Sequence, residues 1–188
     1  MGVNTPPIEA AERLLTGEEA LALGDIGPYE LIEGRIVHMS PTKPKHGKLE
    51  MRLGKLLSNF VDERQLGEVL VGEVGIYIRR NPDTVRAADV LFISNERLAK
   101  ASPHSFLDVA PELVAEIVSP DDRWSEIREK IREYFSIGVR VVLVLEPEQR
   151  VVTVYRSPTN LRELTTADTL TLEDILPGFS VLVAELFS

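Results

Sequence analysis

The spacing of apolar residues changes along the chain, and each change marks a helix or a strand. Leucine and phenylalanine recur at offsets of four, three, one and three over residues 49–60, which predicts an amphipathic helix ending at Gly67. A second helix is predicted over residues 124–137, with Gly138 placed to end it. The inner face predicted for this second helix comprises Trp124, Ile127, Ile131, Tyr134 and Phe135.

Short apolar runs bounded by turn residues predict strands around these helices. We expect strands at residues 29–32, 35–39, 68–78, 86–93, 112–118, 140–145 and 150–155. A capping-box pattern at Thr16 and Glu19 predicts a short first helix, and a β-rich tail ends in another short helix near residues 183–187. This order predicts an α/β (α+β) fold with a mixed central sheet flanked by helices. We treat residues 1–188 as a single domain, with residues 1–15 as an N-terminal extension.

The composition is that of a folded protein in a reducing compartment. The 188 residues include no cysteine, which excludes disulfides and thiolate metal sites. We see neither a signal peptide nor an apolar run near the roughly 18 residues that span a bilayer, so we expect a cytoplasmic protein. The formal net charge of -9 argues against broad, non-specific binding to nucleic acid, although a local basic groove remains compatible with it.

Glu116 is an isolated carboxylate in the otherwise apolar run of residues 112–118. A buried carboxylate needs a cation, a proton or a metal ion. Asp89 also follows alanines in a strand-like segment, where aspartate is disfavoured. Together the two acids predict a site for one or two divalent ions, because Mg²⁺ prefers carboxylate oxygens. The alternatives are that Glu116 is a strand-end acid paired with an arginine and that Asp89 caps a turn or a strand start.

Lys130 borders the apolar face of the second predicted helix. From there its amine can extend along the sheet toward Glu116. Glu126 lies four residues upstream, however, so an exposed pair between Glu126 and Lys130 explains the spacing equally well. His46 begins the helix over residues 49–60, but the three histidines have no metal-ligand spacing.

Four separated segments, taken in order, resemble the Uma family of restriction-endonuclease-like proteins in the PD-(D/E)XK nuclease superfamily. They are YELIEGRIVHMSP from residue 29, ADVLFI from residue 88, APELVAEIVSP from residue 110 and EKIREYFSIGV from residue 129. The similarity covers the chain from about residue 16 to the C-terminal segments LPGF and VAELF. The resemblance implies a restriction-endonuclease-like core.

The resemblance also implies roles for particular residues. Asp89 and Glu116 look like the two metal-binding acids of the superfamily, with Ala88 where the first motif usually has proline. The superfamily's lysine normally lies two residues after the second acid, where this chain has Val118. Lys130 therefore resembles a relocated catalytic lysine. Glu30 and His46, in segments similar to the family's, are expected to line the site.

These residues predict an endonuclease that cleaves DNA with Mg²⁺ or Mn²⁺. Such hydrolysis needs a metal ion to activate water and a cation to stabilise negative charge in the transition state. Two other functions stay open: a binding or regulatory module that lost catalysis, and a metal-dependent hydrolase of another substrate. By analogy with nucleases that address two strands, we also expect a homodimer.

Overall fold

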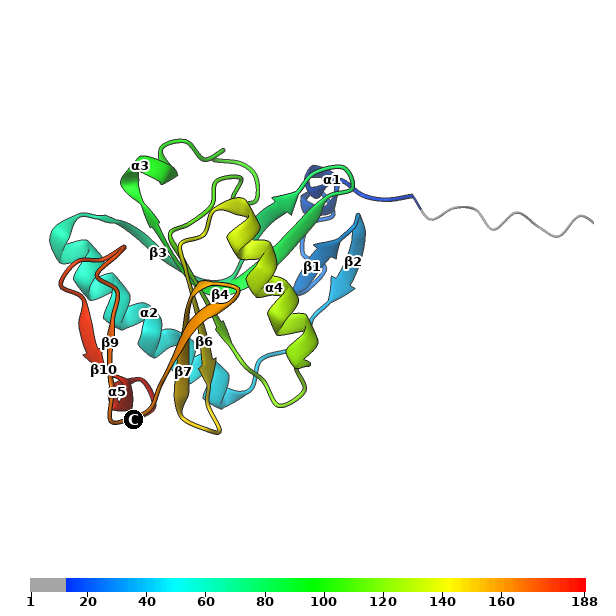
Figure 1. Cartoon of the computed structure of the whole chain (residues 1–188). Coiled ribbons are helices and arrows are strands. Elements are labelled where there is room, and N and C mark those ends of the chain that lie inside the picture. The colour runs from blue at the N-terminus through cyan, green and yellow to red at the C-terminus, as the bar shows by residue number, and fades with distance from the viewer. Residues whose placement is uncertain (1–12) are drawn as a thin grey trace, which may run out of the picture.

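The computed structural model describes residues 13–188, which fold around one eight-stranded sheet (Figure 1). Its strands are β1 (Tyr29–Ile32), β2 (Arg35–His38), β3 (Gly67–Arg79), β4 (Thr84–Ser94), β5 (Leu113–Ile117), β6 (Val141–Glu146), β7 (Val151–Ser157) and β8 (Asn160–Leu164). The strand order is β2-β1-β4-β5-β6-β7-β8, with β3 paired to β4. β5 and β6 are parallel and the other pairs are antiparallel, so the sheet is mixed as predicted.

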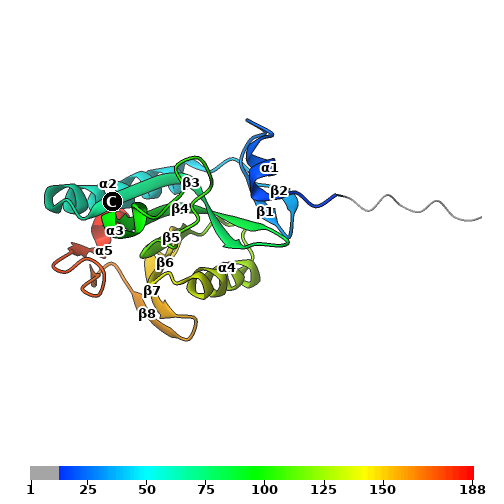
Figure 2. The same cartoon turned by 90° about the horizontal axis from the view of Figure 1, so that it is seen from above.

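Helices cover both faces of this sheet. They are α1 (Gly17–Leu21), α2 (Pro44–Arg64), α3 (Asn95–Leu98), α4 (Trp124–Ile137) and α5 (Val183–Leu186). Figure 2 shows the two long helices, α2 and α4, on opposite sides of the sheet. The tail adds a small hairpin, β9 (Thr169–Thr171) and β10 (Ser180–Leu182). None of the described helices is both long enough and apolar enough to cross a membrane.

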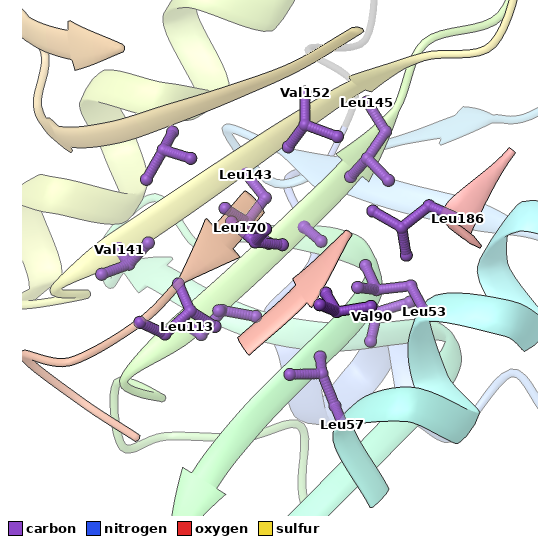
Figure 3. Close-up of a cluster of buried hydrophobic side chains, with 14 of the residues drawn as sticks. Leu53, Leu57, Val90, Leu113, Val141, Leu143, Leu145, Val152, Leu170 and Leu186 are labelled. Atoms are coloured by element: carbon purple, nitrogen blue, oxygen red, sulfur yellow. The ribbon is translucent and has the colours of Figure 1, made fainter. Parts of the chain in front are cut away.

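Two buried apolar clusters hold these layers together. On the α2 face, Leu53 and Leu57 pack against alternate residues of β5 and β6 and against the tail, including Leu170 and Leu186 (Figure 3). On the α4 face, Ile127 and the other inner residues of α4 pack against the intervening residues of the same strands. Because β5 and β6 are covered on both faces, their sequences are almost continuously apolar.

Two details of the predicted helices are wrong. α2 ends at Arg64 and is capped by Gln65, which has a positive φ of 52°, and Gly67 begins β3 instead. Gly67 lies so close to β4 that a Cβ atom would be 2.1 Å from the carbonyl oxygen of Ile93, so close strand approach explains this glycine. Trp124 does not belong to the inner face of α4, since it is 40% exposed. As the first residue of the helix, it lies beyond the packed turn that starts at Ile127.

β4 is the strand that organises the sheet, because three strands pair with it. β3 follows one edge over almost its whole length. The opposite edge is shared: β1 pairs at Val85 and β5 pairs over Val90 to Phe92. Strand pairing on this edge is therefore interrupted over residues 86–89, where β1 and β5 diverge. Asp89, expected near a strand start, lies within this interruption in the middle of β4.

A bulge in β3 lies opposite the same point. Gly72 and Glu73 of β3 together face the single residue Asp89, and both have positive φ angles of 89° and 60°. The alternation of β4 shifts there, because Ala88 and Leu91 both contact the apolar cluster under α4. Bulges commonly redirect side chains beside functional sites. Here the bulge and the interrupted pairing coincide at Asp89.

Candidate active site

Two carboxylates meet where β1 and β5 diverge. The pairing of Val90 with Ala115, continued by one residue pair, places Asp89 opposite Glu116 on the neighbouring strand. Asp89 Oδ2 accepts a hydrogen bond from the backbone N–H of Ile117 at 2.6 Å. Both acids are buried, each with 8% of its surface exposed. The interpretation of Asp89 as a cap of a turn or strand start is wrong, because β4 extends well beyond it on both sides.

Glu116 projects from β5 toward α4 and is held there by two donors. Tyr134 Oη donates to its Oε1 at 2.6 Å, and Lys130 Nζ donates to its Oε2 at 3.0 Å. Burial raises the pKa of Glu116 to about 7, and the neighbouring negative charge of Asp89 adds to this, although Lys130 and Tyr134 act in the opposite direction. Glu116 therefore titrates near neutral pH. The alternative pairing of Glu116 with an arginine is wrong.

Lys130 reaches the sheet from α4 and lies between two acids. Its Nζ atom is 2.9 Å from Glu30 Oε1 and 3.0 Å from Glu116 Oε2. Burial lowers the pKa of Lys130, but Glu116 and Glu30 more than offset this and raise the pKa above its usual value, so the amine stays charged. The alternative of an exposed pair with Glu126 is therefore wrong. Only 17% of the Lys130 side chain is exposed.

Glu30, on β1, connects Lys130 to a buried arginine. Its Oε1 accepts from the backbone N–H of Ala87 at 3.1 Å, and its Oε2 accepts from Arg86 at 2.8 Å. Arg86 also donates to Glu133 of α4 at 2.6 Å. Burial would raise the pKa of Glu30, but Lys130 and Arg86 lower it below its usual value. Glu30 thus satisfies a backbone N–H in the interrupted segment of β4 and remains ionised.

His46 approaches Asp89 from the opposite face of the sheet, near the start of α2. Its Nε2 atom lies 3.3 Å from Asp89 Oδ1, outside hydrogen-bonding geometry, so this buried nitrogen has no hydrogen-bond partner among the described residues. Its Nδ1 atom is 3.5 Å from Ser119 Oγ. Burial lowers the pKa of His46, but Asp89 and nearby Glu50 raise it above its usual value overall.

Glu50 lies one helical turn after His46 and fixes the bulge. Its Oε1 accepts from the backbone N–H of Gly72 at 2.8 Å. Burial raises the pKa of Glu50, and Asp89 acts in the same direction. The structure therefore brings Asp89, Glu116, Lys130, Glu30 and His46 together, as the sequence predicts, and adds Glu50 beside them.

Sequence analysis did not assign three of these neighbours to the site. Tyr134 and Glu50 each lie four residues after a candidate, Lys130 and His46 respectively, so helical spacing is the signal that would have found them. Arg86 gives no comparable signal, because its role depends on the divergence of β1 and β5.

The donor set suits a hard divalent ion, although the described residues 13–188 contain no group of three or more histidine, cysteine or acidic side chains arranged to hold one. Around the site, four carboxylates face two cations, Arg86 and Lys130. The carboxylates are Glu30, Asp89, Glu116 and Glu133. The carboxylates therefore outnumber the cations, and a bound divalent ion would reduce this excess of negative charge. Mg²⁺ often binds through one or two carboxylates and keeps several waters, which matches Asp89 and Glu116.

Comparisons with known proteins identify a family and a similar fold. Residues 18–184 match the Uma2 family, described as "Putative restriction endonuclease". The chain is similar to a crystal structure described as "a putative nuclease belonging to DUF820" from Anabaena variabilis ATCC 29413. The two are 18% identical with a TM-score of 0.77, covering 92% of this chain and 97% of the other. No curated protein matches the sequence. The likeness confirms the predicted fold class.

Proposed function

Because the chain belongs to the Uma2 family, described as "Putative restriction endonuclease", we propose that it is a metal-dependent endonuclease that hydrolyses phosphodiester bonds of DNA. In this proposal Asp89 and Glu116 hold Mg²⁺, or Mn²⁺ in the same oxygen-rich site. Lys130 stabilises the negative charge that develops on the phosphate.

The chain's own residues have separable tasks in this proposal. A bound divalent ion would supply Lewis-acid stabilisation of the phosphate oxygens. Lys130 carries a fixed positive charge beside Glu116, and Glu30 holds the amine in place through the ion pair at 2.9 Å. Tyr134 orients the Glu116 carboxylate through its hydrogen bond at 2.6 Å. His46 lies against Asp89 from the other face, with its Nε2 atom 3.3 Å from Asp89 Oδ1, where it can hold that carboxylate in position.

One observation carries the proposal: Lys130 Nζ lies 3.0 Å from Glu116 Oε2, although it comes from α4 and not from β5. Val118 occupies the superfamily's usual lysine position and carries no charge. Lys130 supplies the amine to Glu116 from α4 instead. The convergence of two acids and one lysine from β4, β5 and α4 is the arrangement that metal-assisted phosphodiester hydrolysis requires.

The test is cleavage of supercoiled plasmid DNA by purified protein with Mg²⁺, with Mn²⁺ and with a chelator. We expect nicked or linear product only with a divalent ion. Asp89→Asn, purified identically, is the control for contaminating nucleases and should give no product. Equal cleavage by the wild type and Asp89→Asn, or no cleavage of any DNA, contradicts the proposal.

A binding module without catalysis is the second candidate, and one observation favours it. Both carboxylate oxygens of Glu116 already accept hydrogen bonds, from Tyr134 and Lys130, so the network is complete without an ion. In that case Mg²⁺ would neither stabilise the protein nor permit cleavage, while DNA binding would persist. A Mg²⁺ titration followed by thermal unfolding separates the two functions.

Three further expectations remain proposals. We propose that the protein acts as a homodimer, by analogy with nucleases that address two strands, and sedimentation at working concentration tests this. We propose a cytoplasmic location, consistent with the lack of cysteine. We also treat residues 1–188 as one domain. The expected extension over residues 1–15 falls largely outside the described residues, and Leu15 at its end donates to the carbonyl oxygen of Gly34 at 2.8 Å.

A further inference from the structure

Two adjoining cavities lie along the start of α2, and the inner one is lined by His46 of the candidate active site. The inner one, about 230 Å³, is lined by His46, Ser119 and Pro147 among others. The outer one, about 300 Å³, is lined by Lys48, Arg150 and Phe187 among others. Lys45 and Pro147 line both, so the two cavities are neighbours. Figure 1 shows the three segments that form them, the start of α2, the β6–β7 turn and the C-terminal end, along the lower edge of the molecule.

The outer cavity is lined by well-packed segments of the fold. Its apolar floor includes Leu49 and Leu186, which belong to the buried cluster on the α2 face. Arg52 of α2 donates to the carbonyl oxygen of Glu185 at 3.2 Å and to Ser188 Oγ at 2.6 Å, which fastens the C-terminal segment to α2. The cationic side chains at its rim therefore project from a packed base.

The charge of this region is opposite to that of the whole chain, whose net charge is -9. Lys48 and Arg150 are exposed and form no ion pair with another described residue. Lys45 is paired with Glu148 at 2.8 Å, but this pair is exposed on both sides and is therefore weak. A polyanion entering the cavities would meet two unpaired cations and a third held by a single exchangeable partner.

We propose that Lys45, Lys48 and Arg150 form a track for the phosphate backbone of a DNA strand, which leads along the two cavities to the carboxylates beside His46. This inference rests on the proposed function for the identity of the ligand. Phosphate contacts of this kind position a strand without reading its sequence. The track places positive charge next to an acidic site that would otherwise repel DNA.

The test measures binding without cleavage. A fluorescently labelled DNA duplex of about twenty base pairs is titrated with protein in a chelator, at several salt concentrations between about 50 and 200 mM. Lys48→Ala/Arg150→Ala is compared with Arg128→Ala/Arg132→Ala, which removes the same charge from exposed arginines of α4 that line a separate cavity. Both double variants should melt like the wild type, since all four side chains are exposed.

We expect Lys48→Ala/Arg150→Ala to weaken binding about tenfold or more at about 100 mM salt. The slope of log affinity against log salt should become shallower by about two, because each duplex phosphate contact contributes about 0.9. The α4 double variant should keep the wild-type affinity and slope. Equal losses in both variants, or unchanged binding in the first, would overturn the track.

Glu148 supplies a test with the opposite sign. Glu148→Gln releases Lys45 and should strengthen duplex binding several-fold, whereas Glu63→Gln, at the far end of α2 and paired with Arg64, should not. An equal gain in both variants, which means a general charge effect, contradicts the track. A wild type that binds DNA through these residues but never cleaves it would contradict the proposed function and leave the track intact. A Lys48→Ala/Arg150→Ala variant that cleaves DNA with full efficiency would do the reverse.

Discussion

Glu112, directly before β5, and Glu116, near the end of β5, lie four residues apart, and each has 8% of its surface exposed. Glu112 accepts from the backbone N–H of Ser94 at 2.9 Å and from its hydroxyl at 2.7 Å, and Arg97 Nε lies 3.2 Å away. Glu116 is close enough to Asp89 to feel its negative charge, and it shares Lys130 with Glu30.

The two glutamates show that burial alone does not mark a site. Glu112 is surrounded by hydrogen-bond donors from Ser94 and Arg97, which match its charge. These contacts also attach α3 to the sheet. At the Glu116 end, carboxylates outnumber cations, and burial with Asp89 raises the pKa of Glu116 to about 7. Unmatched negative charge, and not burial, is what a divalent ion would relieve.

Neutralising each glutamate in turn tests most directly whether Glu112 and Glu116 have different roles. Glu116→Gln should lower cleavage at least about a hundredfold, because losing a residue that merely hydrogen-bonds to a metal ligand can already cost that much and Glu116 is itself a proposed ligand. It should disturb folding little, since a glutamine side chain has nearly the same size and its amide oxygen can still accept from Tyr134 or Lys130. Glu112→Gln should leave cleavage unchanged and lower the free energy of unfolding by about 1–3 kcal/mol. Plasmid cleavage and denaturant unfolding measure both; a reversed pattern would falsify the contrast.

Replacing the cation at each end extends the test. Lys130→Ala should lower cleavage about a hundredfold. It should also destabilise the protein by about 3 kcal/mol, because two buried acids lose their partner. This stability cost is larger than the exposed pair with Glu126 would give. Arg97→Ala, at the Glu112 end, should affect only stability. Full cleavage by Lys130→Ala would remove the lysine from the mechanism but leave Asp89 and Glu116 as proposed ligands.

Metal binding can be measured without activity. At a Mg²⁺ concentration about a hundred times its Kd, the wild type should gain about 2.7 kcal/mol, which corresponds to a rise in Tm of about 5–10 °C. Glu112→Gln should show the same rise and Asp89→Asn should show none. A rise that survives in Asp89→Asn would place the ion elsewhere.

The pH dependence of this Mg²⁺ effect should report Glu116. A metal ion competes with the proton, so below pH 7 the Mg²⁺ affinity should fall about tenfold per pH unit as Glu116 becomes protonated. In metal-free protein the folded pKa of about 7 exceeds the ordinary value of 4.5, so folding favours the protonated form. The contribution of Glu116 to stability therefore declines as the pH rises from about 4.5 to 7. Glu116→Gln should remove that decline, whereas Glu112→Gln should keep it.

The smallest expected effect concerns Tyr134. Tyr134→Phe removes the hydrogen bond to Glu116 Oε1 at 2.6 Å, which helps to keep the carboxylate ionised. The midpoint of the pH dependence of Mg²⁺ binding should move upward, with a stability loss of about 1–2 kcal/mol. A stability loss with an unmoved midpoint would mean that Tyr134 only fills space beneath the sheet.

Much of the fold could be predicted from the sequence because its signals are local. Alternating apolar residues, the spacing in α2 and α4, and the capping box at Thr16 depend on neighbours a few residues away, and the structure confirms these elements. Glu116 and Asp89 were also recognisable, because a carboxylate inside an apolar run is unusual wherever the strand lies in the sheet.

Other features depend on which strands become neighbours. β1 and β5 share one edge of β4, which leaves strand pairing interrupted over residues 86–89. In this interruption Glu30 accepts hydrogen bonds from the Arg86 side chain and from the backbone N–H of Ala87. The β3 bulge redirects Asp89 without any mark in the sequence of β4 itself. The partner of Lys130 also depends on tertiary structure. Its position on the helix is compatible with a pair with Glu126 and with a contact to Glu116, and only the packing of α4 on the sheet selects Glu116. Which residues carry charge into the core can therefore be read from the sequence, whereas the pairing of the strands sets which of those charges are matched.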